Sequence, residues 1–186
     1  RPVAKGDIIF VPAGTIHAIG AGIVLAEIQQ RNDTTFRLFD YGRQRELHEK
    51  NAVAVSHAGP VQPQSGPRRI SAARTALITS QHFVIELIDL PANSNWALNA
   101  DRETWILAIE GRARIGVTSI SVGDAVFIEG DRTGIEVGAG GMSGLMAYPG
   151  PDSLAALLED VAELTKSVGM SAGHLPRSNK TVEVQA

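Results

Sequence analysis

The chain has 186 residues, of which 44% are hydrophobic and 20% are charged, and its formal net charge at pH 7 is -3. This composition is typical of a globular protein with one domain or two small ones, and the weak negative charge disfavours binding to nucleic acid. No apolar stretch is long enough to span a bilayer, and the absence of cysteine excludes disulfides and thiolate metal sites, so we expect a cytoplasmic protein with no membrane partner.

The pattern before residue 30 predicts short strands separated by turns. Residues 7–11 form an apolar run that stops at Pro12-Ala13-Gly14, because proline has no amide donor for a sheet and glycine tolerates a tight turn. Residues 15–19 alternate between two faces and place His17 on one of them, and residues 23–29 alternate again. We therefore predict three strands, the second of which holds His17 rigidly.

Three polar side chains in and after this segment are candidates for chemistry. Glu27 falls among apolar neighbours on the third predicted strand, and burial there would raise the pKa of its carboxyl group unless a cation compensates. Arg37, beyond the next turn, is a candidate for that cation. On the pattern alone, His17 is either a metal ligand or a half-buried structural histidine. Likewise, Glu27 and Arg37 form either a functional pair or a surface pair at the rim of a barrel.

Several separately spaced elements of residues 6–48 resemble one known family. VPAGTIHAIG is followed by EIQQ, an Asn-Asp-Thr-Thr turn, an arginine, DYGR and RELH. This order resembles the class I, zinc-dependent mannose-6-phosphate isomerases, which are cupin-fold proteins. The resemblance implies that His17 is a zinc ligand, Glu27 an active-site glutamate and Arg37 the catalytic arginine.

The resemblance also implies a reaction and a substrate. Members of this family interconvert mannose 6-phosphate and fructose 6-phosphate through a zinc-assisted enediol mechanism, so a sugar phosphate is the expected partner. The sequence does not identify the general base. Arg31 and Arg43 are candidates for phosphate binding, with surface placement as the alternative.

One part of the family pattern has no counterpart in this sequence. The family carries its other zinc ligands, a Gln-x-His pair and a glutamate, upstream of the segment that contains His17. A catalytic zinc site generally needs three protein ligands, so His17 alone would not hold the ion. We therefore expect residues 1–57 to be the C-terminal part of a catalytic cupin module, and the 186-residue chain by itself to be inactive.

Composition changes after residue 57. Residues 58–69 hold three prolines and two glycines, which is typical of a linker. Residues 70–150 then predict an all-β, jelly-roll module, because short alternating runs are separated by glycine turns. The expected strands are 76–79, 83–90, 104–109, 113–117, 125–128, 134–137 and 143–148.

An internal repeat relates the two modules. Gly6-Asp7-Ile8-Ile9-Phe10-Val11 aligns with Gly123-Asp124-Ala125-Val126-Phe127-Ile128, and the following turns have the same length. This alignment places Gly134 opposite His17. Residues 103–111 resemble the cupin glutamate-to-glycine motif, but the histidines that stand just before the glutamate in that motif are missing, which favours a structural or surface role for Glu103. We therefore predict that the second module is metal-free.

The C-terminal part predicts one helix and a tail. Residues 151–166 carry an apolar stripe at helical spacing, made of Leu154, Leu157, Leu158, Val161 and Leu164. Residues 167–186 are polar and contain glycine, so we expect a flexible tail. The predicted fold is thus all-β, with two cupin modules of which the first is partial, plus one C-terminal helix.

A second function of a different class remains open. The chain is alternatively a non-catalytic cupin module that binds a sugar or has a structural or oligomerisation role. The sequence leaves the oligomeric state undetermined.

Overall fold

The computed structural model of the chain describes residues 2–30, 32, 34–60 and 65–171. The chain divides into two compact units. The first consists of Arg1–Leu87 and Met146–Ser153, and the second consists of Ile88–Leu145 and Leu154–Ala186. The predicted domain boundary at residues 58–69 stays a prediction, since residues 61–64 lie outside the described part.

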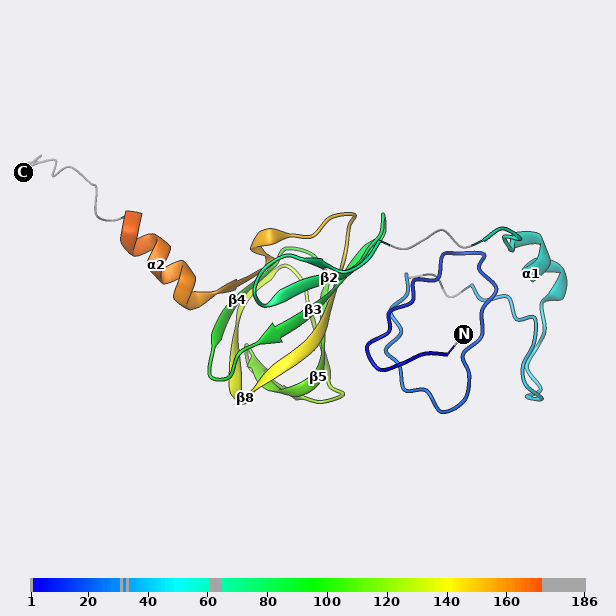
Figure 1. Cartoon of the computed structure of the whole chain (residues 1–186), viewed down its shortest axis with the longest axis horizontal. Helices are drawn as coiled ribbons and strands as arrows, with labels where there is room; N and C mark the ends of the chain where they lie inside the picture. Colours follow the sequence, from blue (N-terminus) through cyan, green and yellow to red (C-terminus); the bar gives the residue numbers. More distant parts are fainter. Residues whose placement is uncertain (1, 31, 33, 61–64, 172–186) are drawn as a thin grey trace, which may run out of the picture. The chain divides into compact units, whose positions relative to one another are not determined.

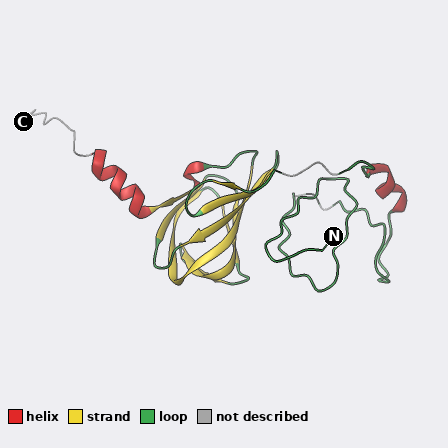
Figure 2. Ribbon diagram, in the orientation of Figure 1, coloured by secondary structure: helices red, strands yellow, loops and turns green. Residues whose placement is uncertain are grey.

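Strands dominate the described residues after 67 (Figures 1 and 2). In chain order the elements are α1 (Glu49–Val55), β1 (Arg68–Arg69), β2 (Arg74–Thr79), β3 (Phe83–Leu90), β4 (Asn95–Ala100), β5 (Thr104–Ile115), β6 (Thr118–Ser121), β7 (Ala125–Ile128), β8 (Asp131–Pro149), the 3₁₀ turn η1 (Ala155–Leu157), β9 (Leu158–Asp160) and α2 (Val161–Ser171).

The strands form one nine-stranded sheet. Its main path is β1-β2-β3-β8-β4-β9, and β5 pairs with β6, β7 and β8. The pairs β4–β8, β5–β6 and β5–β7 are antiparallel. In the β4–β8 pair, Ala97 lies opposite Gly134, so the position that aligns with His17 faces a small residue.

Glycines mark close backbone approach here as well as turns. The sequence predicted separate strands on either side of Gly111 and of the cluster 138–141, but β5 and β8 run through both positions. A Cβ atom at Gly111 would lie 2.0 Å from the carbonyl oxygen of Gly141, and one at Gly144 would lie 2.7 Å from that of Leu107. Glycine therefore lets β8 lie against β5, a role that sequence spacing does not distinguish from a turn.

The core of this sheet contains one charged network. Arg74 on β2, Glu86 on β3 and Tyr148 on β8 are each at most 2% exposed. The guanidinium of Arg74 donates to both carboxylate oxygens of Glu86, from Nε at 2.7 Å and from Nη2 at 2.9 Å, and the Tyr148 hydroxyl also donates to Glu86. Because isolated buried charges are costly, this pairing is what makes the burial of Glu86 tolerable.

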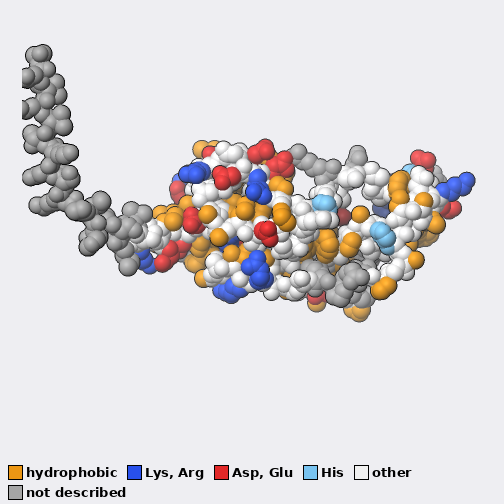
Figure 3. Space-filling model, turned by 90° about the horizontal axis from the view of Figure 1, so that it is seen from above, with side chains coloured by type: hydrophobic (Ala, Val, Ile, Leu, Met, Phe, Trp, Pro, Cys, Tyr) orange, Lys and Arg blue, Asp and Glu red, His pale blue; other side chains and the backbone are white. Residues whose placement is uncertain are grey.

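Residues 2–48 differ from the sequence prediction. The three strands expected at 7–11, 15–19 and 23–29 are not present, and these residues are loops and turns (Figure 2). Large apolar side chains of this segment face solvent, including Ile16 at 65% and Leu25 at 47% exposed, and hydrophobic side chains appear on its surface (Figure 3). A strand needs a hydrogen-bonded neighbour, and none of the described strands pairs with this segment.

The apolar run at residues 52–55 does not form a strand. Those residues belong to the helix α1, in which Ala52 is buried. The four-residue apolar run was too short to separate a strand from a buried helical turn.

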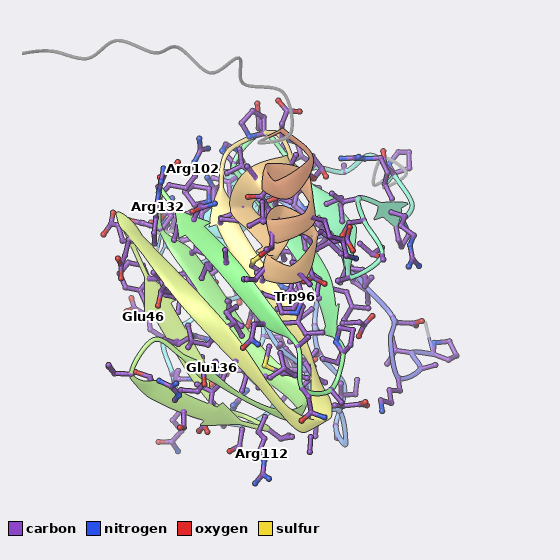
Figure 4. All side chains as sticks on the ribbon, turned by 90° about the vertical axis from the view of Figure 1, so that its left-hand side faces the viewer. Glu46, Trp96, Arg102, Arg112, Arg132 and Glu136 are labelled. Carbon is purple, nitrogen blue, oxygen red and sulfur yellow. The ribbon has the colours of Figure 1, made fainter. Side chains whose placement is uncertain are left out.

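The C-terminal helix is confirmed, but its position is shifted. Residues 158–160 form β9, which pairs with the edge of β4 from Trp96 to Leu98. The helix α2 therefore begins at Val161 instead of near residue 151, because pairing to an open sheet edge overrides the helical pattern. α2 contacts β4, and Figure 4 shows Trp96 beside it. Residues 172–186 of the predicted tail lie outside the described residues.

None of the helices in the described ranges is both long and apolar enough to cross a membrane.

Candidate functional site

His17 follows a turn that is anchored from a distant part of the chain. The amide of Thr15 donates to the carbonyl of Pro12 at 3.1 Å, and Gly14 has a φ of +81°, a conformation that favours glycine. The backbone amide of His57 donates to Gly14 O at 3.0 Å, and its ring Nδ1 lies 3.2 Å from Ala13 O. A Cβ atom at Gly14 would lie only 2.3 Å from this ring nitrogen, so glycine is required.

The His17 ring makes one hydrogen bond to the backbone. Its side chain is exposed, and its Nδ1 lies 2.9 Å from the backbone carbonyl of Thr15. A carbonyl only accepts, so Nδ1 donates this hydrogen bond, and in the neutral ring Nε2 then keeps its lone pair. This arrangement, with one ring nitrogen donating to a backbone carbonyl, is usual for metal-binding histidines.

Glu27 does not have the surroundings that its sequence neighbours predicted. Its side chain is exposed, because residues 23–29 form no strand that would bury it. Arg37 is not its partner in this structure, since the guanidinium of Arg37 lies against Asp40.

Arg37 is the most firmly held of the three predicted site residues. Its side chain is 23% exposed, its Nε lies 3.6 Å from Asp40 Oδ1, and its Nη1 donates to the backbone carbonyl of Glu46 at 3.2 Å. The backbone of Arg37 is held as well, because its amide donates to His48 Nδ1 at 3.2 Å and its carbonyl accepts from the His48 amide at 2.8 Å. Side chain and backbone are thus fixed together.

Asp40 is the centre of an arginine cluster that the sequence did not predict. Its carboxylate is 4% exposed and accepts from both Nη2 and Nε of Arg45, the latter at 3.1 Å, while Arg43 Nε lies 3.4 Å from Oδ1. The turn between them has positive φ at Tyr41 (50°) and Gly42 (78°), and the Arg43 amide donates to Asp40 O at 2.9 Å. Two positive φ values are typical of a type I′ turn, which brings both arginines back to Asp40.

This cluster holds Asp40 in its charged form. The Arg45 side chain, through its hydrogen bonds to the carboxylate, lowers the pKa of Asp40 below its ordinary value, with smaller contributions from the Arg45 amide and from the charges of Arg45 and Arg43. An Asp40 carboxylate that is ionised at neutral pH is suited to orienting the guanidinium of Arg37.

Acidification is expected to weaken this cluster. Because the folded chain binds the Asp40 proton less readily than the unfolded chain, the stabilisation is complete above about pH 4, the ordinary range of aspartate, and is lost as pH falls through the lowered pKa of Asp40. We expect Asp40→Asn to flatten the dependence of the unfolding free energy on pH below about pH 4. Urea denaturation at a series of pH values measures this dependence. Asp89→Asn, at an exposed carboxylate of β3, is the control and should leave the wild-type slope. A slope for Asp40→Asn as steep as wild type would contradict the assignment.

Among the described residues, no hydrogen bond or ion pair joins any two of His17, Glu27 and Arg37. Arg37 and His17 are each held by their own local network, and Arg31 and Asp33 lie outside the described residues. Across the described ranges, no three His, Cys, Asp or Glu side chains are grouped so as to hold a metal ion. The described part of this segment therefore holds these candidate residues separately, and a metal at His17 would need further ligands.

Comparison with known proteins supports the family resemblance. The chain is 51% identical over 59 residues to the mannose-6-phosphate isomerase ManA of Bacillus subtilis (strain 168), which is 28% of this chain and 19% of that protein. It is 37% identical over 89 residues to the mannose-6-phosphate isomerase of Streptococcus mutans serotype c, which is 44% of this chain and 28% of that protein. No family model matches the chain.

Among solved structures, the Lactobacillus farciminis oxalate decarboxylase formate complex aligns with 61% of this chain and 42% of that chain, at a TM-score of 0.45 and 15% identity. The curated relatives confirm the resemblance to mannose-6-phosphate isomerases, and the structure confirms an all-β fold with a C-terminal helix. The chain spans less than a third of the length of these two curated relatives.

Proposed function

We propose that this chain contributes part of the active site of a mannose-6-phosphate isomerase, which interconverts mannose 6-phosphate and fructose 6-phosphate in the cytoplasm. The relatives that carry this name suggest the reaction. The observation that supports it most is the fixed guanidinium of Arg37, because an oriented cation suits a reaction that develops negative charge on oxygen.

The reaction moves a proton between two neighbouring carbons of the open-chain sugar. A base removes the proton from C2 of the aldose, the electrons of that bond form the C1–C2 double bond, and the C1 carbonyl oxygen takes up charge and then a proton. The resulting enediol loses its O2 proton and gains one at C1, which gives the ketose. Arg37 is assigned to stabilise the oxygen charge, and Glu27, exposed to solvent, is assigned to proton transfer or to a place beside the metal.

The proposed cofactor is zinc, with His17 as one ligand through Nε2. The hydrogen bond from Nδ1 to Thr15 O fixes the ring in the tautomer that this requires. When bound, zinc polarises the sugar oxygens at the reacting carbons. The remaining ligands are assigned to segments beyond this sequence, as the family resemblance implies.

The domain organisation forms part of the same proposal. Residues 1–57 are the C-terminal part of the catalytic module, joined by residues 58–69 to a metal-free module at 70–150. The exposed apolar side chains among residues 2–48 support this assignment, because strands of a complete module would pair with the segment and cover them.

Replacing His17 with alanine is expected to lower the zinc content of the complete gene product. One nitrogen ligand is lost, and the other ligands alone hold the ion more weakly. Elemental analysis of the purified protein measures the ratio of zinc to chain. His82→Ala, at an exposed histidine in the turn between β2 and β3, should keep the wild-type ratio. An unchanged ratio in His17→Ala would remove this residue from the site.

A coupled assay with mannose 6-phosphate tests the function itself. The complete gene product should bind about one zinc and turn over, whereas the 186-residue chain alone should not, because it lacks most of the ligands that zinc generally requires. Absence of turnover in the complete gene product would refute the proposal.

A non-catalytic interaction module is the second candidate. The paired aromatic side chains Trp105 and Phe127 on β5 and β7 favour it, because they stay 49% and 40% exposed with ring centroids 4.8 Å apart. Exposed aromatic pairs are more typical of contact surfaces than of a monomer's outer face. If the complete protein neither binds zinc nor turns over, this function is favoured.

A further inference from the structure

His48 joins the helix α1 to the backbone of Arg37. It is the N-cap residue of α1, and its carbonyl accepts from the Ala52 amide at 2.8 Å. Its own side chain makes no capping hydrogen bond, so the ring is available for another contact. That contact is the amide of Arg37, 11 positions earlier in the chain.

The bond between these two residues is reciprocal. The Arg37 amide donates to His48 Nδ1 at 3.2 Å, and the His48 amide donates to the Arg37 carbonyl at 2.8 Å. The ring also meets the edge of Phe36, with centroids 6.1 Å apart. Both polar groups of the Arg37 backbone therefore depend on one residue, which is 27% exposed at its side chain.

The hydrogen bond from the Arg37 amide to the ring defines which nitrogen of His48 carries the proton. An amide only donates, so Nδ1 must be the unprotonated nitrogen and Nε2 must carry the proton. The carboxylate of Glu46 lies 3.9 Å from Nε2, the nitrogen that carries the proton. The backbone carbonyl of the same Glu46 accepts from Arg37 Nη1, so Glu46 and His48 hold opposite ends of the arginine.

We propose that His48 is a positioning residue for Arg37, acting through its neutral, Nε2-protonated ring as the acceptor for the Arg37 amide. His48 fixes where the arginine backbone lies, while Asp40 and the Glu46 carbonyl fix the direction of the guanidinium. The effect of His48 on catalysis rests on the proposed isomerase function. The hydrogen bond between His48 and Arg37 is independent of that function, so the bond and its catalytic effect are tested separately.

The contact is tested by nuclear magnetic resonance on the complete gene product labelled with ¹⁵N. Long-range ¹H–¹⁵N spectra at neutral pH should show His48 as the Nε2-protonated tautomer, and hydrogen exchange should show a protected Arg37 amide. A His48 ring protonated at Nδ1, or an Arg37 amide that exchanges as fast as an exposed loop amide, would overturn the inference whether or not the protein is an isomerase.

The catalytic role is tested with two replacements at one position. His48→Leu removes the acceptor, and we expect kcat to fall roughly tenfold to a hundredfold with KM and zinc content nearly unchanged, because displacing a catalytic group by a fraction of an ångström is costly. His48→Asn places an oxygen where Nδ1 lies, and it should restore kcat to within about threefold of wild type and restore protection of the Arg37 amide.

The matched control is His82→Leu. The His82 ring makes no hydrogen bond to the described residues, so kcat should not change. Wild-type kcat in His48→Leu, or a His48→Asn variant as slow as His48→Leu, would overturn the positioning role. A wild-type protein without isomerase activity would refute the proposed function and leave the ring and exchange measurements to decide the contact.

Discussion

Replacing Arg37 with alanine should lower kcat of the complete gene product by roughly 10²–10³-fold, the loss found when one preorganised donor to a developing oxyanion is removed. The guanidinium is already fixed before substrate arrives, by Asp40 at 3.6 Å and by the Glu46 carbonyl at 3.2 Å, so little reorganisation opposes its action. KM should change less than kcat, because the charge that Arg37 stabilises develops only during the reaction. The coupled mannose 6-phosphate assay measures both constants.

Two further variants test whether the loss in Arg37→Ala is specific to the guanidinium of this residue. Arg37→Lys keeps the charge but not the planar fork that contacts two partners, so it should restore little of the activity. Arg112→Ala removes an exposed arginine of β5, seen in Figure 4, and should leave kcat unchanged. Zinc content should stay normal in all three variants. Near-wild-type kcat in Arg37→Ala would exclude this residue from the reaction.

Replacing Glu86 with leucine should destabilise the fold by about 3–5 kcal/mol, the typical cost of removing one partner of a buried ion pair. The variant leaves the guanidinium of Arg74, at most 2% exposed, without its carboxylate, and takes away the acceptor of the Tyr148 hydroxyl. Urea denaturation of the chain, followed by the fluorescence of Trp96 and Trp105, measures the free energy of unfolding.

The control for Glu86 is a carboxylate that differs mainly in burial. Glu136 on β8 pairs with Arg114 on β5 at the surface, with side chains 57% and 48% exposed, and Figure 4 shows Glu136 on its strand. Glu136→Leu should cost less than about 1 kcal/mol, because water screens exposed pairs. Replacing the whole buried network at once, as Arg74→Met, Glu86→Leu and Tyr148→Phe, should recover most of the lost stability. Equal losses in Glu86→Leu and Glu136→Leu would show that burial does not set the value of the pair.

The strands after residue 70 were predictable where a two-residue alternation was strong. β3 and β7 have the predicted bounds, since Phe83–Leu90 and Ala125–Ile128 combine bulky apolar residues with clear turn signals. β4 was missed because Asn95–Ala100 contains two asparagines and two alanines, which favour a strand only once β8 and β9 lie on either side of it. The glycines within β5 and β8 were wrongly predicted to end strands. They are required by close contact with a neighbouring strand, and the sequence does not show which strands are neighbours.

The sequence offered candidate site residues but not the residues that hold them in place. His17 and Arg37 are candidates from spaced motifs and stay predictions. The arginines reach Asp40 through a turn with positive φ at Tyr41 and Gly42, and His48 meets Arg37 across 11 positions, and neither arrangement has a local sequence signal. The run DYGRQRELH offered one usable signal, a single aspartate followed by two arginines within five positions. The predicted burial of Glu27 failed because burial requires a neighbouring strand, which local sequence cannot provide.

The bond between His57 and the turn at Ala13 and Gly14 joins positions 44 residues apart and closes a long loop that contains His17, Glu27 and Arg37. The chain-entropy cost of such a closure rises only slowly with length, by about 0.6 kcal/mol for each doubling. Extra residues inserted into the exposed stretch at 18–30 would therefore add little to the cost of closing the loop. Replacing Gly14 would instead break the contact with His57, because any side chain there would collide with the His57 ring. We therefore expect the segment between Gly14 and His57 to tolerate sequence changes better than these two residues do.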